Sequence, residues 1–384
     1  MRKRVEQSKN KKKENNKKIL VNIVTVLLIL LLIILGLLFI LNFKKIGIIR
    51  SNKLQEIDIN SYVDINYSKE SEMASGENEL IVYDKGKIYA INSNSNITWE
   101  YGVNNLIEPK INIASNYIML VDNYNGSYYI FKNKELISEN KINNKIKNSG
   151  IDKRGTCFFN YSDKGYKNMI RICNSKNEKY NNIYLMSNIV SNVILKDDFI
   201  YYNDIITNNN KIESKINRIN IKDSKLKIEE VLKLENETVY NFYFNSYCAI
   251  INTSNNIYKF HLKNKEIESM VKLDENVLFA DYNKNTLITI TKKYDNMKKE
   301  VSVKSKNITF NFLNEMVFEE EPYLLEFKNG IATIIDNNFV YLLNSQVQKL
   351  KQYKLSSSVS DLEMFNNGNS IAIVIANKIY ILNL

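Results

Sequence analysis

The sequence offers little of the chemistry on which common catalytic sites depend. His261 is the only histidine, and it lies in an alternating apolar stretch (IYKFHL, residues 257–262) that is typical of a β-strand. One histidine cannot supply a metal site that needs two, and it is a poor basis for a catalytic triad. The 11 glycines form neither a phosphate-binding loop nor a Gly-x-Ser-x-Gly elbow. We therefore predict no catalytic, cofactor-binding or metal-binding residues.

The three cysteines, Cys157, Cys173 and Cys248, lack the CxxC spacing of a zinc site or redox motif. Cys157 and Cys173 are equidistant from residue 165, so they could face each other across a hairpin. Whether they pair is left open by the sequence. The favoured interpretation is that all three are small apolar strand residues, because free cysteines are commonly buried.

Carboxylates leave one catalytic alternative. Glycosidase chemistry needs only two acidic groups at the right separation, which a sequence does not show. The candidates are the Glu run at residues 319–321, Asp197, Asp198, Asp122 and Asp281. The stretch DNYNG at residues 122–126 has oxygen ligands and a glycine but lacks the later glutamate of a calcium loop, so we predict a hairpin turn there.

Aromatic side chains are plentiful, with 25 Tyr and 16 Phe against one Trp. Most of them lie in predicted strands, where they are expected to pack in the core. Tyr124, Tyr166 and Tyr294 lie in predicted turns instead. An exposed tyrosine can stack on a sugar ring or a peptide, so these three are the candidate binding residues.

The elements that position these residues follow from one repeated stretch. Residues 80–103, LIVYDKGKIYAINSNSNITWEYGV, predict three short strands at 80–83, 87–92 and 97–103, separated by turn residues. A single copy could not bury its apolar faces, so the unit needs neighbours.

Approximations of the second strand return along the whole chain. They are KIYAIN (87–92), YYIFKN (128–133), MIRICN (169–174), KINRIN (215–220), IYKFHL (257–262), EVSVKS (300–305), FVYLLN (339–344) and KIYILN (378–383). Each follows another apolar strand, and the mean spacing is about 42 residues, the length of a four-stranded propeller blade. We predict an all-β propeller of eight blades. The alternative is seven, if the irregular stretch at residues 180–223 is miscounted.

Closure of the ring is predicted from the two ends of the chain. The chain stops at Leu384, directly after the second strand of the last unit, so the last blade lacks outer strands. Near the other end, Ile57, Ile59, Val63 and Ile65 alternate with polar residues as in an edge strand. We predict that residues 58–68 supply one or both of the missing strands.

The first unit, KIYAINSNSNITWEY, resembles the pyrroloquinoline-quinone-like (PQQ-like) propeller repeat, in which a Tyr-Ala-Leu strand, a turn and a Trp recur. This resemblance implies a fold, because many members of the repeat class bind no quinone. The Asp-x-x-x-Gly turn of that repeat is lost throughout, and Trp99 is the only tryptophan. The layout of a basic tail, one membrane span and a propeller is similar to an uncharacterised membrane-anchored β-propeller family of Gram-positive bacteria.

The first 56 residues predict a membrane anchor. Residues 1–18 carry nine basic and two acidic side chains, and residues 19–43 are almost uninterrupted Leu, Ile and Val, long enough to span a bilayer. No Ala-x-Ala cleavage site follows, so we predict an uncleaved signal-anchor with the N-terminus in the cytoplasm. We expect a cytoplasmic tail at 1–18, the span at 19–43, a stalk at 44–56 and an extracellular propeller at 57–384.

Net charge argues against nucleic acid as a partner. The chain carries 53 basic and 42 acidic residues, a net charge of +11, but without the tail only +4 remains. We therefore predict a membrane-anchored binding or scaffold module, with the membrane and an envelope protein or glycan as partners. The alternative is a carbohydrate-active hydrolase or lyase using carboxylates and Tyr. A sensor is a third possibility, although the 18-residue tail holds no output domain.

Overall fold

The structure is a computed structural model in which residues 54–384 form one compact unit. It describes residues 55–56, 62–163, 165–177, 180–185, 189–208, 211–244, 248–273, 277–283, 285–295, 298–307 and 309–383. The predicted tail, membrane span and almost all of the stalk lie outside these residues. Within the described ranges, no helix is long and apolar enough to cross a membrane.

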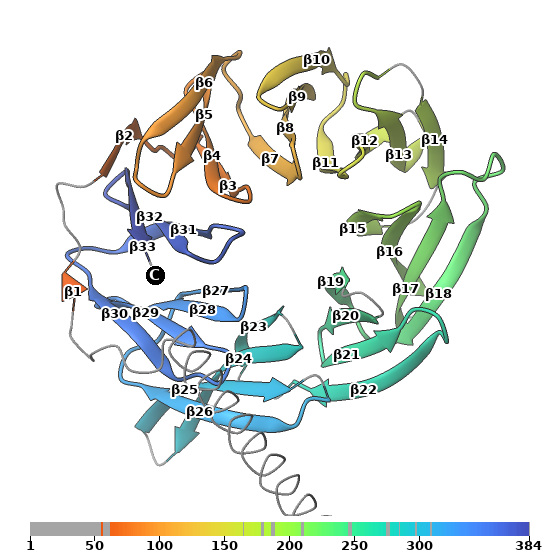
Figure 1. The fold of residues 1–384 in the computed structure, drawn as a ribbon. Helices are drawn as coiled ribbons and strands as arrows, with labels where there is room; N and C mark the ends of the chain where they lie inside the picture. Colours follow the sequence, from red (N-terminus) through yellow and green to blue (C-terminus); the bar gives the residue numbers. More distant parts are fainter. Residues whose placement is uncertain are drawn as a thin grey trace, which may run out of the picture. The chain divides into compact units, whose positions relative to one another are not determined.

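Eight antiparallel sheets are arranged around an axis as the blades of a propeller (Figure 1). From the innermost to the outermost strand, blade 1 is β3 (Glu72–Ser75), β4 (Glu79–Asp84), β5 (Lys87–Asn92) and β6 (Ile97–Gly102). Blade 2 is β7 (Pro109–Ala114), β8 (Tyr117–Asp122), β9 (Ser127–Lys132) and β10 (Glu135–Lys141). Blade 3 is β11 (Ile146–Ile151), β12 (Thr156–Asp163), β13 (Tyr166–Asn174) and β14 (Tyr180–Leu185).

The same order continues around the ring. Blade 4 is β15 (Ile189–Lys196), β16 (Phe199–Asn208), β17 (Lys211–Asn220) and β18 (Ile228–Glu235). Blade 5 is β19 (Val239–Phe244), β20 (Cys248–Thr253), β21 (Asn256–His261) and β22 (Glu266–Lys272). Blade 6 is β23 (Val277–Asn283), β24 (Thr286–Asp295), β25 (Lys298–Asn307) and β26 (Phe312–Phe318). The stretch at residues 180–223 holds β14 and most of blade 4, so the count is eight.

The last two blades include strands from the N-terminal side of the chain. Blade 7 is β27 (Leu324–Lys328), β28 (Ile331–Ile335), β29 (Phe339–Asn344) and β30 (Lys349–Lys354). Blade 8 is β31 (Val359–Met364), β32 (Ser370–Ile375), β33 (Lys378–Asn383) and, outermost, β2 (Tyr62–Asn66). β2 pairs antiparallel with β33, which confirms the predicted closure with one strand. A fifth strand on blade 7, β1 (Gln55–Glu56), runs parallel to β30 and was not predicted.

The second strand of each blade explains why the repeat was visible in the sequence. β8 and β32 are buried at every position, because neighbouring blades cover both of their faces. In the sequence, such strands appear as continuous apolar runs rather than as alternating apolar and polar residues. The outermost strand β6, in contrast, has no buried residue, and outer strands are accordingly the least faithful part of the repeat.

The core of the propeller lies between the blades. Among the described residues, buried apolar side chains form eight clusters, and each cluster joins two neighbouring blades. Between blades 1 and 2, for example, Tyr83 packs with Leu120 and Phe131. Each seam between blades is therefore a small hydrophobic core of its own.

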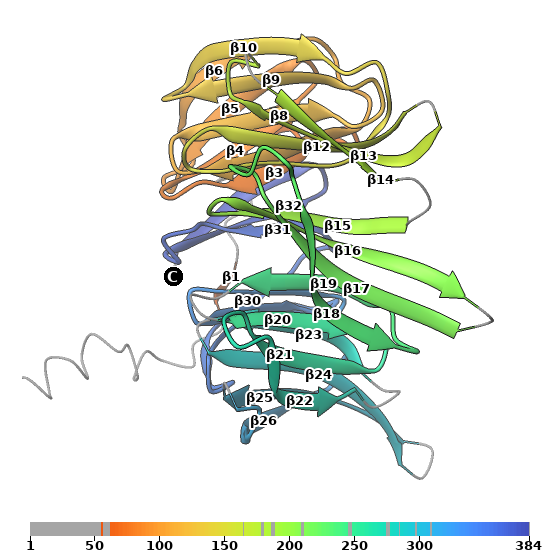
Figure 2. The same cartoon turned by 90° about the vertical axis from the view of Figure 1, so that its right-hand side faces the viewer.

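Antiparallel blades give the ring two distinct faces. The turns between second and third strands lie on one face together with the links between blades, and the remaining turns lie on the other. We call these the long-hairpin face and the short-turn face. The strand pairs β16–β17 and β24–β25, each with strands of 10 residues, extend furthest from the long-hairpin face (Figure 2).

Candidate functional site

The three predicted tyrosines lie on one face of the ring but on different blades. Tyr124 lies in the turn between the second and third strands of blade 2, as predicted. Tyr166 and Tyr294 were predicted in turns but lie in strands, because the hairpins of blades 3 and 6 extend further than the repeat suggested: Tyr166 is the first residue of β13, and Tyr294 lies in β24. The backbone of Tyr294 pairs with Lys299, and its side chain is outside the described part of the structure. The topology thus places all three at the long-hairpin face without bringing them into one site.

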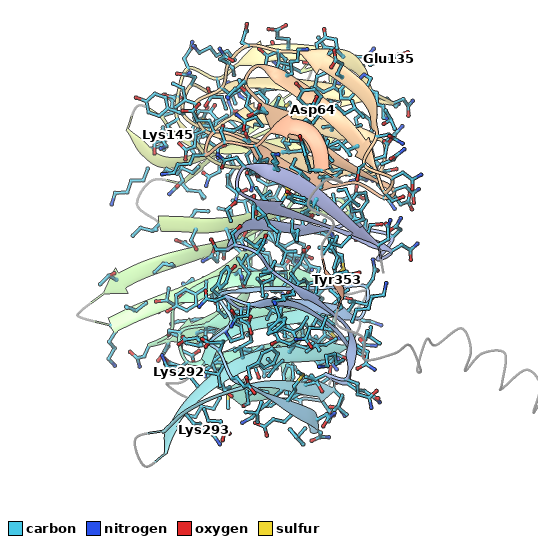
Figure 3. The ribbon with its side chains drawn as sticks, turned by 90° about the vertical axis from the view of Figure 1, so that its left-hand side faces the viewer. Asp64, Glu135, Lys145, Lys292, Lys293 and Tyr353 are labelled. Atoms are coloured by element: carbon cyan, nitrogen blue, oxygen red, sulfur yellow. The ribbon has the colours of Figure 1, made fainter. Side chains whose placement is uncertain are left out.

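Two of these tyrosines have side-chain neighbours of their own. Tyr124 is 55 % exposed, and the Nζ atom of Lys145, labelled in Figure 3, lies 5.7 Å from its ring centroid. The ring centroids of Tyr166 and Tyr184 are 4.7 Å apart. Their binding role stays a prediction.

Asp122 forms the predicted hairpin turn. It is 1 % exposed, and its carboxylate accepts hydrogen bonds from the backbone N–H groups of Ile107, Glu108 and Tyr124 and from the amide of Asn125. Burial opposes its ionisation, but these bonds outweigh it and lower the pKa of Asp122. At Gly126, φ is +76° and a Cβ atom would lie 1.8 Å from a backbone oxygen, so the turn requires glycine.

Two of the other acidic candidates form ion pairs. Asp198 pairs with Lys222 at 2.7 Å and with Arg154, and Glu321 pairs with Lys292 at 3.1 Å. Among the described residues, no group of three or more His, Cys, Asp or Glu side chains is placed to hold a metal ion.

Cys157 and Cys173 stand directly opposite each other in the pairing of β12 with β13. Both are buried, and the structure has them as free thiols. A hydrogen bond with Cys173 and burial raise the pKa of the Cys157 thiol well above its usual range. The same hydrogen bond lowers the pKa of Cys173. The buried, neutral thiol of Cys157 is unreactive, which fits a packing role.

Carboxylates from different blades instead converge on the innermost strands. Each of these strands is the free edge of its sheet, so part of its backbone N–H groups lacks a partner within the blade. Three carboxylates reach across a seam to such groups on the next blade. The pairs are Asp281 with the N–H of Phe327 (3.0 Å), Glu326 with that of Met364 (2.6 Å) and Glu363 with that of Ser75 (3.0 Å).

Lys328 contacts two of these three carboxylates, Glu326 and Glu363. Its Nζ atom is 3.2 Å from Glu363 and 3.8 Å from Glu326, and it also donates to the carbonyl of Met364 at 2.9 Å. Burial and the neighbouring charge of Glu363 raise the pKa of Glu326 to about 8. Burial likewise raises the pKa of Asp281. Glu326 is therefore largely protonated at neutral pH.

Sequence analysis named Asp281 but missed Glu326 and Glu363. Both follow leucine in the short inner strands LLEFK and VSDLEM, so a glutamate between two apolar neighbours was the available signal. The inner strands repeat poorly, however, and the partner of each carboxylate is a backbone group on another blade. Neither fact is visible along one sequence.

The structure also contains a pocket of about 620 Å³ between blades 1 and 2, on the short-turn face. We call it the seam pocket. Apolar side chains of Ile81, Ile113 and Ile118 line it together with the polar residues Asn78, Asn92, Asn116, Asn133, Glu79 and Lys134. Its volume falls within the range of small-molecule sites. On the opposite face, the same seam holds a smaller pocket of about 440 Å³ lined by Tyr83 and Asn105.

An ion pair in the wall of the seam pocket links the two blades. Lys134 Nζ lies 2.8 Å from Glu79, and the hydroxyl of Thr98 donates to Glu79 at 2.7 Å. Burial opposes ionisation of Glu79, but the bonds from Lys134 and Thr98 outweigh it and lower its pKa. Glu79 is thus ionised at neutral pH, and the opposite charges of Glu79 and Lys134 offset each other in the wall.

Comparison with known proteins confirms the fold. No protein-family model and no curated protein matches this sequence. The structure is similar to BamB from Moraxella catarrhalis, with a TM-score of 0.57 and 10 % identity, over 84 % of this chain and 98 % of that one. It is also similar to Sqt1 from Saccharomyces cerevisiae, with a TM-score of 0.54 and 10 % identity, over 88 % and 100 %. At this identity, the similarity establishes a β-propeller and nothing more specific.

Proposed function

We propose that this protein is a non-catalytic binding module, a propeller of the PQQ-like class held at the cell envelope by a single-pass anchor at residues 19–43. The observation that carries the proposal is that the acidic side chains form hydrogen bonds with the backbone. Asp122, Asp281, Glu326 and Glu363 each accept backbone hydrogen bonds within or between blades, so they act as structural ties. A rigid ring with a preformed pocket at one seam is suited to binding.

The anchor and address rest on the sequence. A basic tail followed by 25 apolar residues favours an N-terminus in the cytoplasm and a propeller outside. At that location, the propeller meets envelope proteins and glycans rather than nucleic acid. Its partner belongs to one of these two classes.

The test is crosslinking in intact cells with the affinity-tagged full chain. The control keeps only residues 1–53, so it has the tail and the span without the propeller. We expect a defined envelope protein or glycan to be recovered with the full chain and lost with the control. Equal recovery with both proteins, or no recovery with either, would contradict a binding role for the propeller.

One observation supports a second candidate, a carbohydrate-active enzyme. Glu326, with its pKa raised to about 8, lies near Glu363, and a protonated acid beside a second carboxyl group is what glycoside hydrolysis requires. The discriminating assay incubates purified envelope glycan with the full chain and looks for new fragments by mass spectrometry. Fragments formed by the wild type and lost in Glu326→Gln would favour the enzyme.

A further inference from the structure

We propose that the seam pocket binds an uncharged, hydroxyl-rich ligand of the size of a mono- or disaccharide. This inference deepens the binding function proposed above and rests on it. The argument depends on three properties of the described pocket residues: unused amide donors, a wall that repels anions and an aliphatic floor.

The amide groups around the pocket keep hydrogen-bonding capacity. Asn78 and Asn133 each use the side-chain oxygen as an acceptor, from Asn367 at 3.1 Å and from Asn116 at 2.9 Å. Asn92 uses its oxygen to hold the following turn, through the N–H groups of residues 94 and 96. Among the residues that the structure describes, none accepts a hydrogen bond from the amide nitrogens of Asn78, Asn92 or Asn133.

These three donors come from both blades of the seam. Asn78 and Asn92 lie at turns of blade 1, and Asn133 lies in a turn of blade 2. The side-chain oxygen of Asn116, also on blade 2, has no donor among the described residues. The pocket therefore offers several donors and an acceptor to one ligand. A ligand gains specificity where its hydroxyl and carbonyl groups replace the water on these exposed or half-buried amides, because an analogue that covers the amides without such groups would leave them unpaired.

The charge of the wall selects against anionic ligands. Lys134 is paired with Glu79 at 2.8 Å, and Glu77, also at the pocket, adds a further negative charge. An anion such as a sugar phosphate or a peptide carboxylate would meet repulsion from Glu77 without an unpaired cation in the lining to offset it. The lining thus favours a neutral ligand over an anionic one.

The apolar residues at the pocket complete the match to a sugar. Ile81 and Ile118 are buried parts of the core between blades 1 and 2, and Ile113 packs against the same cluster. An aliphatic surface surrounded by amides suits a ring that has a C–H face and polar edges. An extended peptide would instead seek a row of backbone partners at a strand edge.

The experiment is calorimetric titration of the purified full chain, kept in a detergent without a sugar head group. The probes are N-acetylglucosamine, its β-1,4-linked disaccharide, glucose and maltose, with glucose 6-phosphate as a charged probe and an acetylated, amidated Ala-Gly tetrapeptide as a peptide probe. We expect one of the neutral sugars to bind with a Kd on the order of 1 mM or tighter. We expect the sugar phosphate to bind more weakly than glucose.

The test variant is Asn78→Asp/Asn133→Asp, and the control is Asn105→Asp in the pocket on the other face of the same seam. Aspartate keeps the acceptor oxygens that Asn367 and Asn116 use, removes the amide donors and adds a negative charge at each position, which an uncharged sugar tolerates better than an anion would. The double variant should bind the sugar at least about tenfold more weakly, because two hydrogen bonds are lost. The control should bind like the wild type, and both should keep the wild-type melting temperature.

Several results would overturn the inference. They are the absence of sugar binding by the wild type, sugar binding that the double variant retains, and a preference for the tetrapeptide or the phosphate. These results would not by themselves refute the proposed binding module, since crosslinking tests independently whether the propeller captures an envelope component. Capture without sugar binding would refute the saccharide pocket alone, whereas failure of both experiments would refute the binding module too.

Discussion

The seam between blades 8 and 1 and the seam between blades 1 and 2 both carry a charged group that ties their inner strands, but the second seam also opens into a pocket on each face. At the seam between blades 1 and 2, the tie is the ion pair of Lys110 on β7 with Glu72 on β3. Both seams have a buried apolar core. At the first, Glu363 reaches the backbone N–H of Ser75, and Asn366 donates to the carbonyl of the same residue. At the second, amides at turns surround a cavity of about 620 Å³.

The comparison distinguishes polar groups that stabilise the fold from polar groups that remain available to bind a ligand. A carboxylate on an inner strand faces unpaired backbone donors of the next blade, and satisfying them removes it from ligand chemistry. An amide at a turn holds its own turn or a neighbouring side chain with one atom and keeps the other free. The two kinds of seam should therefore respond differently to substitution.

The largest expected effect on stability comes from disrupting β2, the outermost strand of blade 8. Val63 on β2 is 1 % exposed and packs with Leu80 and Ile379. Val63→Asp places a carboxylate in this core without a partner, and we expect a loss of about 3–5 kcal/mol in unfolding free energy. Urea unfolding followed by the fluorescence of Trp99, the only tryptophan, measures it.

The matched control for this variant is Asp64→Asn. Asp64, labelled in Figure 3, is exposed on the same strand. It should unfold within about 0.5 kcal/mol of the wild type. If Val63→Asp were as stable as this control, β2 would not be the strand that closes the ring.

The next effect tests the tie between blades 7 and 8. Glu326→Ala removes the acceptor of the Met364 N–H, which Glu326 contacts at 2.6 Å, and we expect a loss of about 1–3 kcal/mol. Glu326→Gln keeps an acceptor oxygen and resembles the protonated acid, so it should cost less than about 1 kcal/mol at neutral pH. Urea midpoints of the two variants distinguish a backbone tie from a required charge. An equal loss in both would contradict the tie.

The pH dependence of stability tests whether Glu326 is protonated in the folded protein. Burial and Glu363 raise the pKa of Glu326 from 4.5 to about 8 in the folded protein. Between these values, the folded state holds a proton that the unfolded chain releases, so the contribution of Glu326 to stability is fully present below pH about 4.5 and is lost as pH rises towards 8.

We expect this loss to be at most about 1.4 kcal/mol per pH unit. Glu326→Gln should remove it while leaving the contributions of Asp281 and all other groups in place. Urea unfolding of both proteins at pH 5.5, 7 and 8.5 measures the difference. Parallel stability profiles for the two proteins would refute an elevated pKa at Glu326.

The sequence was sufficient to predict the propeller, because strands that are buried on both faces appear as continuous apolar runs. The predicted strands at 87–92, 339–344 and 378–383 coincide with β5, β29 and β33. Closure by residues 58–68 could be predicted because a blade that lacks its outer strand needs one. The predicted span at 19–43 and its topology fall outside the described residues and stay predictions.

The candidate site could not be predicted for a physical reason. A repeat describes contacts along each blade, whereas the carboxylate ties and the seam pocket depend on how one blade is offset against the next. Asn78 and Asn133 are 55 positions apart and belong to ordinary turns, so neither stands out among the many asparagines. The tyrosines predicted in turns stood out by residue type, yet Tyr124 and Tyr166 lie on different blades.

The smallest expected effect on stability is at the seam pocket. Asn78→Asp/Asn133→Asp preserves the acceptor contacts with Asn367 and Asn116, and aspartate tolerates the positive φ of +51° at position 133. We expect the unfolding free energy to stay within about 0.5 kcal/mol of the wild type, measured by the same urea titration. A loss as large as that of Glu326→Ala would mean that these amides tie blades 1 and 2 together. The two seams would then differ in the type of group that closes them, and the amides would no longer be free for a ligand.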